Sequence, residues 1–129
     1  MRAATAYKRV GDNTSVMVAD PLGLVILLYE KLLLRIKEVD VAIGAGDIQG
    51  RGKSTSAAIE IISNGLIGAL DLDRGGDVAV RLKEQYQIWL QMLLQINMNG
   101  DARLLGSLAS GVAEVLSAWK EVKALGLPQ

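Results

Sequence analysis

The chain has 129 residues, with 14 Lys or Arg balanced by 14 Asp or Glu, so its formal net charge is zero. It contains no His, no Cys and no Phe, and half of its residues are hydrophobic. Without imidazole or thiol groups, it cannot form a Ser-His-Asp or Cys-His catalytic system, a zinc site built on those ligands, or a disulfide. Zero net charge gives no general attraction to nucleic acid. Catalysis by carboxylates alone remains, but most Glu residues alternate with Lys or Arg, as on solvated faces. We therefore expect no enzyme, no catalytic residues, no metal site and no cofactor.

The length suits one domain, since domains typically run to about 100 to 150 residues. The mean hydropathy is +0.29, but the strongest apolar run, Leu22 to Tyr29, ends at Glu30 and is far shorter than the roughly 20 residues that span a membrane. Residues 1–20 also lack the apolar core of a signal peptide, because Arg9 and Asp12 interrupt them. We therefore expect a cytoplasmic protein that does not insert into membranes.

Residues 1–19 show no sustained helical period, and Gly11, Asp12 and Asn13 would break a helix. They are predicted to form an irregular N-terminal arm. Its few apolar residues could fold back on the rest of the molecule, or could be partly free and used in binding. Tyr7 raises the same question, because an aromatic residue in this arm has no helical face to complete.

Asp20-Pro21 predicts the start of the first helix, because Asp can cap a helix and Pro fits its first position. Apolar residues then recur at spacings of three and four for about 23 residues, until Gly44 and Gly46 end the pattern. They are Leu22, Val25, Ile26, Tyr29, Leu32, Leu33, Ile36, Val39 and Ile43.

A second helix is predicted from about residues 50–54 to Leu70, ending in the turn at residues 71–76. Its apolar positions are Ala58, Ile59, Ile62, Leu66, Ala69 and Leu70. Gly65 and Gly68 lie inside it, and each costs a helix about 1 kcal/mol relative to Ala. Either the helix is weak there or another backbone packs closely against it.

Two further helices follow, separated by a breaker at residues 97–100. The third has Ala79, Leu82, Tyr86, Trp89, Leu93 and Ile96 at helical spacing, and the fourth, which begins near Asp101, has Leu105, Leu108, Val112, Val115, Trp119 and Val122. Trp89, Trp119, Tyr29 and Tyr86 lie on these inward stripes and are predicted to pack in the core. Four helices with short connections predict an all-α, antiparallel four-helix bundle spanning residues 20–125 as a single domain.

Two segments resemble ligand-binding motifs, a phosphate-binding loop and a calcium loop, but neither has the required spacing. Residues 46–54 end in Gly-Lys-Ser before a helix, but a phosphate-binding loop requires Gly where this chain has Asp47, and the preceding segment has a helical rather than a strand pattern. The aspartates around residues 71–77 lack the ligand spacing and terminal Glu of a calcium loop. A turn between helices and helix capping are the better interpretations.

Apolar residues also lie outside the main stripes. They are Leu24, Leu27, Leu28 and Leu34 in the first helix, and Ile61, Ile67, Ile88, Leu90, Met92, Leu94 and Met98 in the second and third. Tilted helices could widen the buried faces enough to cover them, or the surplus could form a surface for a partner protein. The residue pattern leaves both alternatives open.

Several short motifs along the chain, taken together, resemble those of a known protein family. They are Ala6-Tyr7 in the arm, Asp20-Pro21-Leu22-Gly23-Leu24 and Leu27-Leu28-Tyr29-Glu30 in the first helix, Gly46-Asp47-Ile48, Leu70-Asp71 before Gly75-Gly76, Leu82 and Tyr86, Asn97 with Asp101, and Ala118-Trp119. In this order and spacing the chain resembles the FliS family of flagellar secretion chaperones over essentially its whole length. It departs from the family in the second helix, where Asn64, Gly65 and Gly68 replace a bulkier surface.

The resemblance implies a cytoplasmic chaperone that binds the C-terminal segment of flagellin, prevents its premature polymerisation and helps deliver it to the flagellar type III export apparatus. In that family the bound segment is unstructured alone and becomes extended and helical around the bundle. Such a partner would need the surplus apolar surface. The alternative is a self-associating helical adaptor, which would use the same surplus to form a homodimer.

The resemblance also implies where flagellin would bind. Tyr7 would correspond to the family's N-terminal Tyr, whose arm lies against the bundle and is rearranged when flagellin arrives. The remaining flagellin-binding surface would lie around two groups of residues, one in each of the first two helices. They are Leu22, Leu28 and Tyr29, and Ile61, Leu66 and Leu70.

Overall fold

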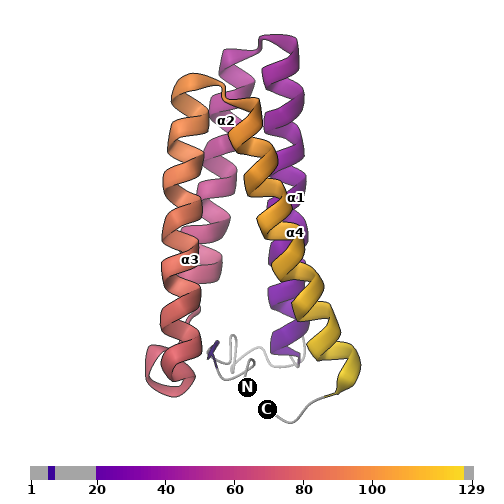
Figure 1. Cartoon of the computed structure of the whole chain (residues 1–129), viewed down its shortest axis with the longest axis vertical. Coiled ribbons are helices and arrows are strands. Elements are labelled where there is room, and N and C mark those ends of the chain that lie inside the picture. The colour runs from indigo at the N-terminus through magenta and orange to yellow at the C-terminus, as the bar shows by residue number, and fades with distance from the viewer. Residues whose placement is uncertain (1–5, 8–19, 127–129) are drawn as a thin grey trace.

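Four long helices run up and down in the computed structural model, which describes residues 6–7 and 20–126 (Figure 1). They are α1 (Pro21–Ala45), α2 (Ile48–Glu60) with its continuation η3 (Ile61–Ile67), α3 (Leu72–Asn99) and α4 (Ala102–Leu125). Helix α1 packs between α2 and α4, and α3 packs against the same two helices from the other side. The predicted all-α antiparallel bundle is thus confirmed. No helix in the described part of the chain is long and apolar enough to cross a membrane.

An aspartate occupies the N-cap position of each of the four helices, but only three of these aspartates accept a capping hydrogen bond. Asp47, Asp71 and Asp101 cap α2, α3 and α4, each accepting a hydrogen bond of 2.9 to 3.0 Å from a backbone N–H three residues on. Asp20 occupies the same position before Pro21 but makes no capping hydrogen bond. Its carboxylate instead pairs with Lys123 Nζ of α4 at 2.7 Å. The capping predicted for Asp20 is therefore replaced by an ion pair between the first and last helices.

The loop between α1 and α2 is shorter than the sequence predicts. Gly46 ends α1 in the left-handed region, at φ 68°, and α2 already begins at Ile48. Residues 46–54, which imitate a phosphate-binding loop in sequence, are therefore a helix cap followed by the first turns of α2. This placement is the one expected for a turn between helices.

The two glycines in the second helix lie in or beside a π-helix, η3, which follows α2 without a break. The wider turn is visible in the hydrogen bond from Gly68 N to Ser63 O, at 3.0 Å. A Cβ at Gly65 would lie 3.3 Å from Leu28 Cδ2, so α1 packs closely here through a side chain. The first alternative is thus confirmed, because the α-helix gives way to a π-helix at these glycines. The close approach of another backbone is wrong, because the neighbour at Gly65 is the side chain of Leu28.

Helix α3 begins earlier than predicted, at Leu72, with one turn capped by Asp71. Gly76 then breaks it with φ 52° and ψ −132°, after which the long straight part of α3 begins. Positive φ is a conformation that glycine adopts without a steric cost. The Gly75-Gly76 pair thus forms a bend at the base of α3.

The core consists of the four predicted stripes with small shifts. Leu116 is buried in α4 where Val115 was predicted, and Val122 is half-buried. Thr55 is buried in α2, where its hydroxyl donates to Arg51 O at 2.7 Å. Figure 1 shows α4 slanting across α1, and such a crossing changes which side of a helix faces the core along its length.

Candidate functional site

Two residues of the N-terminal arm, Ala6 and Tyr7, lie against the end of the bundle where α3 begins (Figure 1). Tyr7 forms an isolated antiparallel bridge with Leu70, and Asp71 N donates a hydrogen bond of 2.7 Å to Ala6 O. The segment between η3 and α3 therefore pairs with the main chain of the arm at Ala6 and Tyr7. We call this place the arm site. The rest of the predicted arm, residues 1–5 and 8–19, lies outside the described residues.

A glycine makes the arm site possible. A Cβ added at Gly75 would lie 2.7 Å from Ala6 Cα and 2.6 Å from Ala79 Cβ, distances that a real side chain does not tolerate. Ala6 is fully buried as a result of this close approach. Glycine at position 75 thus provides the notch into which the backbone of the arm fits.

The side chain of Tyr7 enters the bundle and is only 6% exposed. Its hydroxyl hydrogen-bonds the hydroxyl of Tyr86 on α3, which in turn lies 2.6 Å from the hydroxyl of Tyr29 on α1. Its ring packs edge-on against Trp119 of α4, with centroids 5.9 Å apart and an interplanar angle of 63°. Trp89 packs against both other tyrosines from α3. The socket of Tyr7 is therefore aromatic in its walls and polar at its base.

The three tyrosines, Tyr7, Tyr29 and Tyr86, form what we call the tyrosine cluster. Burial raises the pKa of Tyr29 to about 12, and burial also raises the pKa of Tyr7 and of Tyr86 above the ordinary value. All three are neutral hydroxyls around pH 7, as tyrosines ordinarily are, and can both donate and accept. The site can bind an aromatic or polar group but offers no charge for acid–base chemistry.

The structure brings together three of the seven residues predicted to bind flagellin, since Tyr7, Tyr29 and Leu70 meet at the arm site. It places Leu22 and Leu66 in the core. The remaining two, Leu28 and Ile61, are half-buried on α1 and η3. Their role in binding stays a prediction.

Sequence reasoning missed part of the arm site. It placed Tyr86 and Trp119 in the core, which is correct, but did not identify them as the base and wall of a socket. It also treated Gly75 only as part of a turn. One signal in the sequence could have indicated the socket. A buried Tyr7 needs a polar partner for its hydroxyl, and the other two tyrosines of the chain, Tyr29 and Tyr86, lie at predicted core positions.

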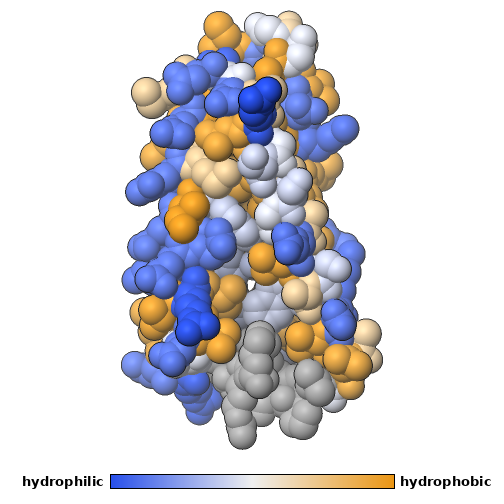
Figure 2. Space-filling view, viewed as in Figure 1, coloured by the Kyte–Doolittle hydropathy of each residue, from blue (hydrophilic) through white to orange (hydrophobic). Residues whose placement is uncertain are grey.

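The surplus apolar residues divide between the two sequence alternatives. Leu28, Ile61, Ile67, Leu90 and Met92 pack partly against the core, as tilted helices would allow. Others remain largely exposed, and orange side chains lie among blue ones over α3 and α4 in Figure 2. The exposed members are Leu27, Leu34, Ile88, Leu94 and Met98. The bundle therefore keeps apolar surface that it does not cover itself.

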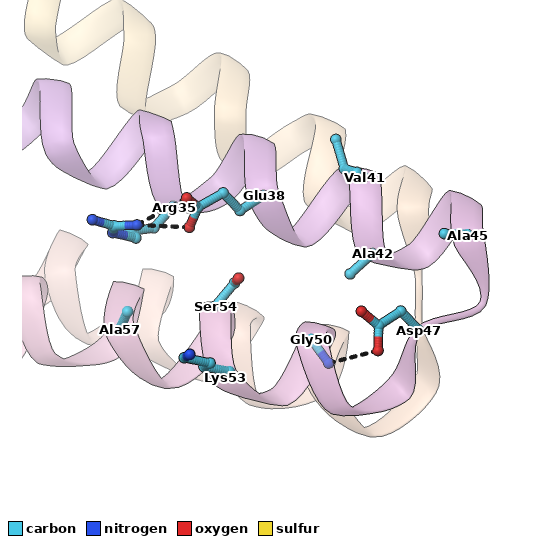
Figure 3. Close-up of a pocket in the computed structure, with 10 residues that line it drawn as sticks. All are labelled: Arg35, Glu38, Val41, Ala42, Ala45, Asp47, Gly50, Lys53, Ser54 and Ala57. Atoms are coloured by element: carbon cyan, nitrogen blue, oxygen red, sulfur yellow. Dashed lines mark hydrogen bonds and ion pairs between the residues drawn. The ribbon is translucent and has the colours of Figure 1, made fainter.

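Two hollows lie alongside α1. A cavity of about 390 Å³ between α1 and α2 is lined by the Arg35–Glu38 ion pair, at 2.8 Å, and by Lys53 and Ser54 (Figure 3). A groove of about 350 Å³ between α1 and α4 has Leu33 among its lining side chains. Within the described ranges no group of three or more His, Cys, Asp or Glu side chains is arranged to hold a metal ion.

Comparison with known proteins gives a consistent result over almost the whole chain. A family model described as "Flagellar protein FliS" matches residues 3–125. The chain is 32% identical over 117 residues to the flagellar secretion chaperone FliS of Salmonella typhimurium, covering 91% of this chain and 87% of the relative. It is 33% identical over 119 residues to the flagellar secretion chaperone FliSB of Pseudomonas aeruginosa, covering 92% and 94%. It is 29% identical over 120 residues to the FliS chaperone of Escherichia coli, covering 93% and 88%.

Proposed function

The chain belongs to the FliS family of flagellar proteins, and from this premise we propose that it is a cytoplasmic export chaperone for flagellin. It would bind the disordered C-terminal segment of flagellin, prevent its premature polymerisation and aid its delivery to the flagellar type III export apparatus. The relatives are named secretion chaperones, which supports a protein that acts by binding rather than by catalysis.

The observation that carries this proposal is the arm site. Its main chain at Leu70 and Asp71 pairs with the main chain of the arm, and its aromatic socket receives a side chain. Neither contact depends on the residues belonging to the same chain. Addition of an extended segment to free main-chain groups is a general way in which proteins bind peptides. A flagellin segment could therefore use the same groups once the arm has left them.

The predicted site would continue from the arm site along α1 and η3. Leu28 and Ile61 are half-buried there and offer apolar area without any rearrangement, whereas Tyr29 and Leu70 become accessible only when the arm moves. Leu22 and Leu66 would support this surface from the core. Ordering a disordered segment costs about 2 to 5 kcal/mol or more, so we expect a large apolar contact without one dominant ion pair.

A calorimetric titration with a peptide of the flagellin C-terminal segment tests the proposal, with a scrambled peptide of equal composition as the control. We expect the authentic peptide to bind at micromolar protein and to gain helical circular dichroism in the complex. The scrambled peptide should do neither. Absence of binding, or binding that leaves the peptide disordered, would refute the chaperone function.

Tyr7→Ala tests whether arm and flagellin compete for one site. Because a docked arm lowers the fraction of binding-competent molecules, its removal should tighten peptide binding by about threefold or more. Ile88→Ala, at an exposed position on α3, is the control and should leave the affinity unchanged. Unfolding of the Tyr7→Ala protein, or an unaltered affinity, would make Tyr7 a structural residue only. If no peptide bound to any variant, the self-associating adaptor would be the better interpretation.

A further inference from the structure

The indole N–H of Trp119 is a buried donor that the described part of the bundle leaves unused. Trp119 is only 3% exposed, and its Nε1 has no hydrogen-bond partner among the described residues. Its ring forms a wall of the socket that holds Tyr7, with ring centroids 5.9 Å apart. Buried donors in proteins nearly always have a partner, so an unused donor in a binding socket indicates capacity for a further group.

This N–H lies near the base of the socket, beside the hydroxyl of Tyr29. Burial raises the pKa of Tyr29, while the Tyr86 hydroxyl and the Trp119 N–H each lower it in part. A donor lowers the pKa of a hydroxyl when it is near enough to stabilise the anion. The Trp119 N–H and the Tyr29 hydroxyl are thus neighbours, although they do not form a hydrogen bond with each other.

The tyrosine cluster also has one proton more than its own contacts can use. Three hydroxyls joined by two contacts, Tyr7 with Tyr86 and Tyr86 with Tyr29, use only two of their three protons. With Tyr7 donating to Tyr86 and Tyr86 donating to Tyr29, the third proton is that of Tyr29, beside the indole N–H of Trp119. In this arrangement the docked arm leaves two neighbouring donors without an acceptor among the described residues.

A carbonyl oxygen fits these two donors better than other polar groups do. It has two lone pairs and no proton, so it can accept from both donors without adding a third. A further hydroxyl would bring another proton that needs an acceptor. A carboxylate would bring a negative charge among Tyr29, Tyr86 and Trp119, which are all neutral, and burial of a charge without a cation is costly.

We propose that Trp119 is a specificity-determining residue for the cargo: its indole N–H, together with the Tyr29 hydroxyl, donates to an amide carbonyl oxygen of the flagellin segment that replaces the arm. This inference rests on the proposed function. The carbonyl group belongs either to an Asn or Gln side chain that enters the socket or to the main chain of the segment. The side chain of Tyr7 has no carbonyl group, and its hydroxyl is bonded to Tyr86, so it leaves both donors unused.

These donors distinguish the arm from the cargo. Specificity is a difference between two affinities. The main-chain groups at Leu70 and Asp71 and the aromatic wall of the socket contact the arm, and the cargo would use the same groups, so they favour neither strongly. Only the cargo would supply an acceptor beside Tyr29. The arm therefore fills the socket but leaves hydrogen-bonding capacity that lets the correct segment displace it.

Replacement of Trp119 by 3-benzothienylalanine removes the donor alone, because sulfur takes the place of the indole N–H and the shape of the side chain is nearly kept. Without cargo this isostere protein should unfold at an unchanged or higher urea concentration, since the N–H makes no hydrogen bond there. Trp119→Phe, which also removes ring volume, should unfold at a lower concentration. Destabilisation by the isostere itself would mean that the N–H is already paired and would overturn the proposal.

Calorimetric titration with the flagellin C-terminal peptide tests the donor in the complex. The peptide should bind the isostere protein about fivefold to thirtyfold more weakly than the unaltered protein. Ile88→Ala, at an exposed position on α3, should leave the affinity unchanged. Equal affinity of the isostere and unaltered proteins would overturn this inference and leave the chaperone function standing. Absence of binding to the unaltered protein would refute the chaperone function, and this inference with it.

Altered peptides identify the acceptor through double-mutant cycles with the isostere protein. Each Asn of the peptide is replaced by Leu and each Gln by Met, one at a time. If a side chain supplies the carbonyl group, one replacement should weaken binding to the unaltered protein but not to the isostere protein. If the main chain supplies it, the isostere should weaken the binding of every peptide equally. Coupling of Trp119 to an Asp or Glu of the peptide would overturn the assignment to an amide.

Nuclear magnetic resonance observes the donor directly, because the chain has two tryptophans and therefore two indole N–H signals. The signal of Trp119 is the one that is absent from the isostere protein. It should move downfield when the unaltered protein is saturated with the flagellin peptide, as an N–H does on forming a hydrogen bond. A Trp119 signal that stays in place while the peptide binds would overturn the proposal.

Discussion

At the scale of single residues, Tyr86 connects parts of the chain that are far apart in sequence. Its hydroxyl lies between those of Tyr7 and Tyr29, which are 79 and 57 residues away along the chain. The sequence predicted that Tyr29 and Tyr86 are buried, because both lie on inward stripes. It could not predict that the hydroxyls meet, because a helical period gives the direction of a side chain and not the depth or axial position of its end.

Tyr86→Phe should destabilise the protein more than Tyr7→Phe does. Removal of the Tyr86 hydroxyl breaks both hydrogen bonds and leaves two buried hydroxyls without it, whereas Tyr7→Phe breaks only one and leaves the Tyr29–Tyr86 bond in place. We expect losses of about 2 to 3 and about 1 kcal/mol in the free energy of unfolding, measured with urea. Equal losses would mean that the central position of Tyr86 has no energetic weight.

The tyrosine cluster should also make stability depend on high pH. Burial raises the pKa of Tyr29 to about 12 and raises those of Tyr7 and Tyr86 as well. Below about pH 10 the hydroxyls are neutral in both folded and unfolded chains, so they cause no change. Between about pH 10 and 12 the unfolded chain releases protons that the folded chain retains, so the free energy of unfolding falls as pH rises.

Ultraviolet absorbance of tyrosinate measures this effect directly, because the chain has three tyrosines and all of them lie in the cluster. The absorbance should appear only when circular dichroism reports unfolding. Each tyrosine should contribute up to about 1.4 kcal/mol per pH unit, so Tyr29→Phe should reduce the slope by that amount. Tyrosinate formed near pH 10 in a folded protein would contradict a buried cluster.

At the scale of elements, the glycines decide where the sequence prediction succeeds and where it fails. The helical stripes predicted all four helices, and Gly46 and Gly100 end α1 and α3 near the expected places, both at positive φ. Gly65 and Gly68 signalled a defect in the second helix, which takes the form of a π-helix with Leu28 of α1 packed against Gly65. That contact is tertiary, so local sequence does not contain it.

Two glycine substitutions should have opposite effects on stability. A Cβ at Gly68 would lie 2.5 Å from the carbonyl oxygen of Asn64, so Gly68→Ala must distort the end of η3 and should cost about 1 to 3 kcal/mol. A Cβ at Gly44, near the end of α1, meets nothing within 4 Å. Gly44→Ala should therefore stabilise the protein by about 0.5 to 1 kcal/mol. Thermal and urea unfolding measure both, and stabilisation by Gly68→Ala would contradict the π-helix.

At the scale of the whole molecule, the apolar surface of the bundle follows from the composition of the chain. Half of the residues are hydrophobic and the net charge is zero. The sequence revealed the surplus of apolar residues but not its distribution, since exposure depends on which helices are neighbours. Leu28 and Ile61 are half-buried on α1 and η3, whereas Leu34 is largely exposed on α1.

This distribution predicts how flagellin binding should respond to salt and temperature. If the cargo replaces the arm on aromatic and aliphatic side chains, screening of charges removes little of the attraction. The Kd for the flagellin peptide should then change less than about threefold between about 0.1 and 1 M salt, in calorimetric titrations of the full chain. The association should also have a negative heat capacity change of at least about 0.3 kcal/mol/K, because apolar surface leaves water. A steep loss of affinity with salt, together with a heat capacity change near zero, would assign binding to charged residues elsewhere on the bundle.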